Sequence, residues 1–254
     1  GVFRVPELTL TFFAIASLAV VFAGISKAGF GSGAAFASSS ILALIVEPGA
    51  ALAFMLPLLM LVDAVSLRPY WRRWKLRESL LLIAGSLPGV GLGVLFYTSV
   101  DADGMRLLIG AIALGFVLWQ VSARLRARLT GVAIPDWGGL LAGVAAGVSS
   151  FVSHAGGPPA AVYLLGRGLS KTEYQASSVL VFGILNSAKF IPYAFLGLFT
   201  LETLKLDLML APFALLGAWI GISLHDKIPE KFFFSMTYVF LTCTGLKLIW
   251  DGLT

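Results

Sequence analysis

The stretch that decides the fold runs from residue 8 to residue 33 and reads LTLTFFAIASLAVVFAGISKAGFGSG. Its first part, residues 8–26, carries no charge, and a helix needs about 17–25 such residues to cross the hydrocarbon core of a bilayer. Lys27 ends this run. Three glycines follow closely, at Gly29, Gly31 and Gly33. Because glycine weakens a helix, we predict a membrane-spanning helix that breaks just after Lys27.

The overall composition agrees with a membrane protein. Hydrophobic residues make up 58% of the 254 residues and charged residues only 12%, whereas about 25% of a soluble domain is charged. The formal net charge is +5, but the basic residues interrupt apolar runs and form no stripe, so nucleic acid is not an expected partner. Cys243 is the single cysteine, which excludes a disulfide framework. We expect no cofactor and no metal.

Further apolar runs predict how many times the chain crosses the bilayer. Long runs occupy residues 8–26, 79–100, 107–123, 137–153 and 208–224, and three more occupy 50–62, 174–188 and 232–246. These runs are apolar on all sides, which favours helices over the alternating pattern of a β-barrel. Two shorter pieces, 34–46 and 160–165, follow Gly- or Pro-rich breaks. The expected fold is therefore an all-α polytopic membrane protein with eight crossings and two short or broken segments.

Charged loops predict the orientation. Basic residues cluster in 68–77 and again in 124–128, and two apolar runs separate the clusters. Both clusters can therefore face the cytoplasm, with Asp101 and Asp103 on the outer side.

The sequence also repeats itself. When it is shifted by 123 positions, residues 24–70 align with 147–193 without a gap. The matched pairs include Gly24 with Gly147, Asp63 with Asn186, Pro69 with Pro192 and Tyr70 with Tyr193. We predict two transmembrane repeats, 1–128 and 129–254, as in many secondary transporters. Five apolar segments per repeat would invert the second copy and four would keep it parallel; the inverted arrangement is favoured because it produces the two-fold related sites of other carriers.

Three charged residues stand inside or at the edge of apolar sequence, namely Lys27, Asp63 and Lys189. A charge at the centre of a membrane helix costs about 2.5–3.5 kcal/mol, so such residues indicate a functional site. In the first break, the candidate substrate-binding residues are Ser26, Lys27, Gly31 and Gly33. A broken helix offers free N–H groups to an anion. The alternative is a surface glycine hinge whose lysine reaches the interface.

The second repeat has its own break, which reads SSFVSHAGGPP from residue 149 to residue 159. Glycine and proline end one helix here and suit the first turn of another. The candidate substrate-binding residues are Ser149, Ser153, His154, Gly156 and Gly157. The alternative for His154 is a structural histidine that forms hydrogen bonds in a loop.

A polar face follows the second break. Asn186, Lys189 and Tyr193 have the spacing of one helical face, and all three are candidate substrate-binding residues. In the first repeat, Asp63 and Tyr70 occupy matching positions. Lys189 requires an acidic partner or an anion, and Asp63 could be that partner, a protonation site or the partner of Lys27. We consider Asp63, His154 and Tyr70 candidates for coupling or gating. Hydrogen bonding between helices, worth about 0.6 kcal/mol per pair, is the alternative.

These segments resemble the TauE/SafE family of sulfite exporter-type permeases. The resemblance lies in the Gly-rich break of residues 24–33, the run SHAGGPP at 153–159 that leads to Tyr163-Leu-Leu, and the pattern Asn186-x-x-Lys189-x-x-Pro-Tyr193. It implies a secondary transporter of the bacterial inner membrane. It also implies a substrate among sulfite, organosulfonates and related sulfur-containing or carboxylate anions, with the direction of transport open.

The expected function is alternating-access transport of a small anion between the two broken segments. Coupling to protons and formation of a homo-oligomer stay open. An anion channel is the nearest alternative. A second alternative is an intramembrane hydrolase that uses Ser150 or Ser153 with His154 and Asp63, although no G-x-S-x-G elbow is present. The sequence therefore predicts a transporter and not an enzyme.

Overall fold

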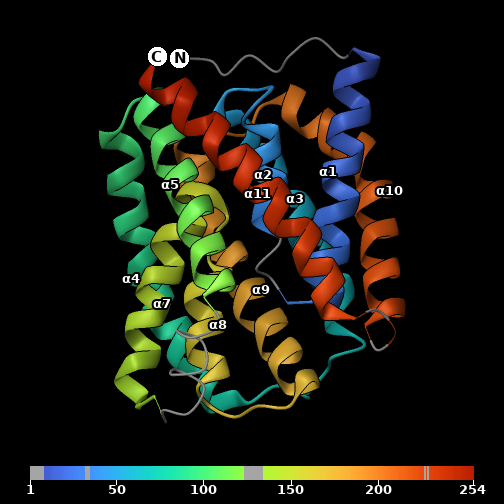
Figure 1. Cartoon of the computed structure of the whole chain (residues 1–254), viewed down its shortest axis with the longest axis vertical. Coiled ribbons are helices and arrows are strands. Elements are labelled where there is room, and N and C mark those ends of the chain that lie inside the picture. Colours follow the sequence, from blue (N-terminus) through green and yellow to red (C-terminus); the bar gives the residue numbers. More distant parts are fainter. Residues whose placement is uncertain (1–8, 32–34, 123–133, 226, 228) are drawn as a thin grey trace.

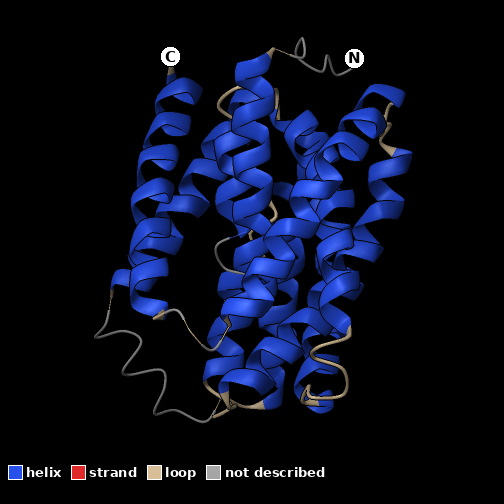
Figure 2. Ribbon diagram, turned by 90° about the vertical axis from the view of Figure 1, so that its right-hand side faces the viewer, coloured by secondary structure: helices blue, strands red, loops and turns tan. Residues whose placement is uncertain are grey.

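The computed structural model describes residues 9–31, 35–122, 134–225, 227 and 229–254, and in these residues the secondary structure is helical (Figures 1 and 2). The long helices are α1 (Leu10–Gly29), α3 (Pro48–Leu67), α4 (Leu76–Ser99), α5 (Ala102–Val121), α7 (Asp136–Ser153), α9 (Lys171–Phe195), α10 (Leu201–Leu224) and α11 (Glu230–Leu253). Two short helices, α2 (Ala35–Leu42) and α8 (Gly157–Leu165), follow α1 and α7. Each of the eight predicted apolar runs overlaps one long helix, although most of the helices extend beyond their runs.

Five of these helices, α1, α3, α4, α9 and α10, are long and apolar enough to cross a membrane. Large apolar side chains stand on the outer surface, as Leu10 (85% exposed) and Phe195 (88% exposed) illustrate. A surface of this kind needs lipid around it, which confirms a multi-pass helical membrane protein. That α5, α7 and α11 also cross stays a prediction.

The two short helices begin after breaks at equivalent positions. Gly31 (φ +78°) follows α1 and His154 (φ +53°) follows α7, so both residues adopt the left-handed conformation, 123 positions apart. α2 has eight residues and α8 has nine. At about 1.5 Å of rise per residue, neither helix covers half of a hydrocarbon core about 30 Å thick. Short helices thus lie at or near the two expected segments, 34–46 and 160–165, with the bounds 35–42 and 157–165.

Two pairs of helices pack most extensively, α1 with α10 and α4 with α7. Glycines allow the close approach. A β-carbon at Gly29 would lie 2.4 Å from the carbonyl oxygen of Gly221, and one at Gly89 would lie 2.4 Å from that of Val144. α3 and α9 contact each other, and each also contacts one pair, α3 with α10 and α9 with α4.

Two glycines of α4 provide a direct test of this packing. Gly89→Ala should lower the free energy of unfolding by about 1–3 kcal/mol, because the new methyl group overpacks the α4–α7 contact. Gly91→Ala is the matched control, since no described atom lies within 4 Å of its β-carbon. Alanine there should leave stability unchanged or raise it by up to about 1 kcal/mol. Thermal unfolding of both purified variants measures the difference, and equal melting temperatures would contradict the packing.

The charged loops lie at opposite ends of the bundle. The chain between α3 and α4 reaches one end, and the junction of α4 with α5, where Asp101 caps α5, lies at the other (Figure 1). Lys75 Nζ lies 2.8 Å from Glu173 Oε1, which raises the pKa of Lys75 and ties this loop to α9. The second basic cluster, 124–128, lies outside the described residues.

Candidate functional site

The first break holds a buried ion pair. Lys27, in the last turn of α1, is 6% exposed, and its Nζ lies 2.8 Å from Oδ1 of Asp63 on α3. The Nζ also lies 5.1 Å from the centre of the Phe182 ring, a distance typical of a cation–π contact. Lys27 is therefore paired inside the protein and is not exposed at its surface. Of the alternatives for Asp63, the structure has the pair with Lys27.

Three side chains from other segments hold the carbonyl end of α1. Gln175 Nε2 donates to the Lys27 carbonyl (2.9 Å), Tyr70 Oη to that of Ala28 (2.8 Å), and His225 Nδ1 lies 2.5 Å from that of Gly29. The last carbonyls of a helix have no partner within it, so these bonds satisfy groups that the break would leave open. They also fix the backbone from which the Lys27 side chain extends.

The second break surrounds a lysine that has no acidic partner among the described residues. Lys189 is 0% exposed. Its Nζ lies 2.8 Å from Ser150 Oγ, 3.1 Å from the Ser150 carbonyl oxygen and 2.8 Å from His154 Nδ1. His154 Nε2 in turn lies 3.1 Å from the carbonyl oxygen of Leu52. Both ring contacts are satisfied when Nε2 carries the proton and Nδ1 accepts from a Lys189 ammonium group.

A contact between equivalent residues of the proposed repeats connects the two breaks. Asn186 Nδ2 donates to Asp63 Oδ2 over 2.7 Å, and these residues are 123 positions apart. Asn186 and Lys189 lie three positions apart on α9 and so share one face of that helix. We call this group the charged cluster, and its members are Lys27, Asp63, Ser150, His154, Asn186 and Lys189. With Lys27 and Lys189 cationic and Asp63 anionic, the charged cluster has a formal charge of +1.

Two tyrosines make the same contact in the two halves. Tyr193 Oη donates to the carbonyl of Phe151 over 2.5 Å, as Tyr70 Oη does to that of Ala28. In both cases the tyrosine lies 42 positions after its acceptor. Tyr70 and Tyr193 therefore hold the ends of α1 and α7, beside the charged cluster.

Several of the predicted substrate-binding residues make no side-chain hydrogen bond to the charged cluster in the described part of the chain. Ser149 and Ser153 donate to carbonyls of their own helix, at 2.6 Å (Ala145) and 2.8 Å (Ser149), so Ser150 is the serine that reaches Lys189. Ser26 is fully buried and its Oγ has no partner among the described residues. Gly33 lies outside the described residues.

The two glycines of the second break are buried beside the charged cluster. Gly157 begins α8. A β-carbon at Gly156 would lie 2.8 Å from the Phe182 ring and 3.0 Å from Ser150 Cβ. Phe182 therefore lies close to both Lys27 and Gly156. Phe182, Gln175 and His225 were not predicted from the sequence.

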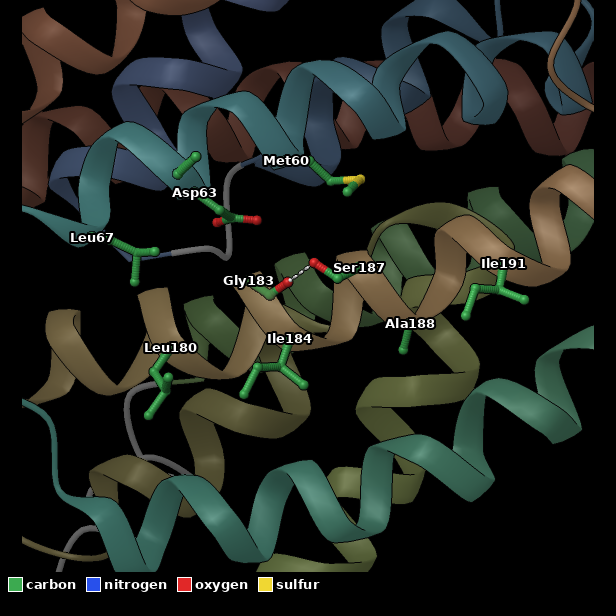
Figure 3. Close-up of a pocket in the computed structure, with 10 residues that line it drawn as sticks. Met60, Asp63, Leu67, Leu180, Gly183, Ile184, Ser187, Ala188 and Ile191 are labelled. Carbon is green, nitrogen blue, oxygen red and sulfur yellow. Dashed lines mark hydrogen bonds between the residues drawn. The ribbon is translucent and has the colours of Figure 1, made fainter.

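A pocket of about 620 Å³ borders the charged cluster between α3 and α9 (Figure 3). Figure 3 shows the Asp63 carboxyl group turned from α3 toward this gap, opposite Gly183 of α9. The residues that line it are mostly apolar: Met60, Ala64, Leu67, Leu180, Ile184, Ala188 and Ile191, with Ser187. Of the charged cluster, Asp63 lines this pocket.

The geometry does not fit the hydrolase alternative. Both ring nitrogens of His154 are occupied, by Lys189 and by the Leu52 carbonyl. Ser150 contacts Lys189, and Ser153 donates to a carbonyl of its own helix. A nucleophilic serine requires a base within hydrogen-bond reach, and no described serine has such a bond to His154.

A helical membrane bundle that encloses an ion pair and a further buried lysine belongs to the class of multi-pass proteins with a polar interior, which is typical of transporters. The chain belongs to the sulfite exporter TauE/SafE family, whose model matches residues 16–248 of the 254. The resemblance found in the sequence motifs is thereby confirmed. No curated protein and no solved structure gives a significant match to the chain.

Proposed function

We propose that this protein is a secondary transporter that carries a small anion across the bacterial inner membrane by alternating access. The substrate class is sulfite, an organosulfonate or a related sulfur-containing or carboxylate anion, in keeping with the name of the family. The observation that carries the proposal is Lys189, which is completely buried and has no acidic partner among the described residues. A buried cation of this kind is costly, and a bound anion would offset that cost.

The proposed architecture is two inverted repeats, residues 1–128 and 129–254, with eight crossings and two short broken segments. The order of elements supports it, because α1 to α5 correspond in length and sequence position to α7 to α11. Equivalent contacts support it too: the Tyr70 and Tyr193 hydrogen bonds, the left-handed residues at Gly31 and His154, and the contact of Asp63 with Asn186. An odd number of segments per repeat inverts the second copy.

In the proposed mechanism the anion binds between the broken ends of α1 and α7. Lys189 supplies the charge, Ser150 and Ser26 supply hydroxyl groups, and the first amides of α8 at Gly157 supply further donors. The glycine-packed pairs α1–α10 and α4–α7 would each move as one body, because they are the most extensively packed pairs and their glycines let the backbones approach closely. Asp63, His154 and Tyr70 are the proposed coupling or gating residues.

A binding panel and an exchange assay test this function together. The purified protein is heated with sulfite, methanesulfonate, acetate, neutral sulfones and cations, since a ligand of the folded state raises its melting temperature by mass action. We expect stabilisation by sulfur-containing anions. In proteoliposomes, unlabelled substrate inside should drive uptake of labelled substrate, which a carrier performs and a channel does not. Stabilisation by a neutral solute or a cation alone would refute anion transport, and flux without exchange would indicate a channel.

A further inference from the structure

We infer that the transporter selects monoanions, and that Asp63 sets this limit by fixing the charge of the site. The inference rests on the proposed function and deepens it, because it names the charge of the substrate. The geometry behind it is the set of hydrogen bonds that fixes the protonation of each member of the charged cluster.

Each member of the charged cluster can be assigned a charge from its contacts. Lys189 Nζ meets three acceptors, which matches the three N–H donors of an ammonium group. We assign His154 as neutral, accepting from this ammonium through Nδ1 and donating to the Leu52 carbonyl through Nε2; the net charge is the same if His154 carries the proton and Lys189 is the neutral amine. Lys27 and Asp63 form an ion pair at 2.8 Å, and Asn186 donates to the same carboxylate. One positive charge is left over.

This surplus charge determines which anion can be neutralised. The side chains of Lys27, Asp63 and Lys189 are between 0% and 6% exposed, so water screens them little. In such a site an uncompensated charge is expensive, whether the protein or the ligand carries it. A monoanion brings the total to zero, whereas a dianion leaves one negative charge inside the protein. A sulfonate, with one charge and three oxygens, is the chemistry that fits.

The equivalence of Asp63 and Asn186 allows the charge to be changed with little change of shape. Asp63→Asn gives the site a charge of +2, and Asn186→Asp gives zero. The double variant exchanges the two residues across their 2.7 Å contact and returns the charge to +1. Asp207→Asn is the matched control, because Asp207 is a buried carboxyl group on α10 (6% exposed) that makes no ion pair with the charged cluster.

The experiment measures the affinities of methanesulfonate and sulfate for wild type and these four variants. The two anions are similar in size and differ by one charge at neutral pH. We expect wild type and Asp207→Asn to favour methanesulfonate by at least about tenfold, and Asp63→Asn to shift the ratio toward sulfate by at least about tenfold. Asn186→Asp should lose methanesulfonate binding, and the double variant should recover the wild-type preference.

The outcomes separate this inference from the function on which it rests. If methanesulfonate binds but the preference is the same in wild type and Asp63→Asn, the charge rule is wrong while anion transport stands. If Asp63→Asn does not fold, Asn186→Asp still decides, because retained methanesulfonate binding at zero charge would overturn the rule. If no anion binds wild type, the proposed function fails and the inference fails with it.

Discussion

Lys189→Met should abolish anion binding and exchange while leaving the empty protein about as stable as wild type. Lys189 is the source of the surplus charge, so the variant has a neutral site, and we expect at least an about 100-fold loss of affinity. Stability should change little because two effects oppose each other. Methionine is apolar and of similar length, which removes the cost of a buried charge, while Ser150 and His154 lose a donor, which costs about 1–3 kcal/mol for each acceptor left without a bond.

Melting temperatures with and without methanesulfonate, followed by exchange in proteoliposomes, measure this result. Lys205→Met is the matched control, since Lys205 lies exposed on α10 and the same chemical change there should affect neither quantity. Anion-dependent stabilisation that survives in Lys189→Met would locate the anion away from the charged cluster. A variant that binds the anion normally but fails to exchange would make Lys189 a gating residue.

Lys189 could be identified from the sequence, because the free-energy cost of placing a charge in the membrane is evident from the neighbouring residues alone. A charge in an apolar run stands out whatever the tertiary structure. Its partners could not be found in the same way. Ser149, Ser150 and Ser153 lie within a single turn of one another, and only the packing of α7 against its neighbours decides that Ser150 faces Lys189. Pairing between helices depends on their relative rotation, which hydropathy does not encode.

The ends of the helices were also only partly predictable from the sequence. The apolar run 174–188 predicted only the middle of α9, because hydropathy ends at the first charged residues. The helix itself begins at Lys171, where Ser170 and Glu173 form a capping box, and it continues through Pro192 to Phe195. The backbone hydrogen bonds of a helix do not require apolar side chains, so the helix can extend past the apolar run to the residue that caps its end. The predicted 123-residue repeat pairs the two breaks, and the left-handed residues at those breaks, Gly31 and His154, lie 123 positions apart.

Lys27→Met, unlike Lys189→Met, should strongly destabilise the protein. Lys27 forms the ion pair of the charged cluster, so its removal leaves the Asp63 carboxylate buried without that partner. Breaking a buried pair by removing one member costs about 3–5 kcal/mol. The cation–π contact with Phe182 is lost as well. The variant should therefore melt well below wild type, and it should not bind an anion, because Asp63 and Lys189 then cancel.

A second substitution distinguishes this account from a general effect of mutating α1. In the double variant Lys27→Met with Asp63→Asn, no carboxylate is orphaned and Lys189 again provides a charge of +1. Stability and methanesulfonate binding should both recover, although neither substitution touches Lys189. Two residues in contact are expected to be non-additive in this way, and a thermodynamic cycle over the four proteins measures the coupling. Additive losses in the double variant would mean that Lys27 binds the anion directly, and that its pairing with Asp63 belongs only to the empty site.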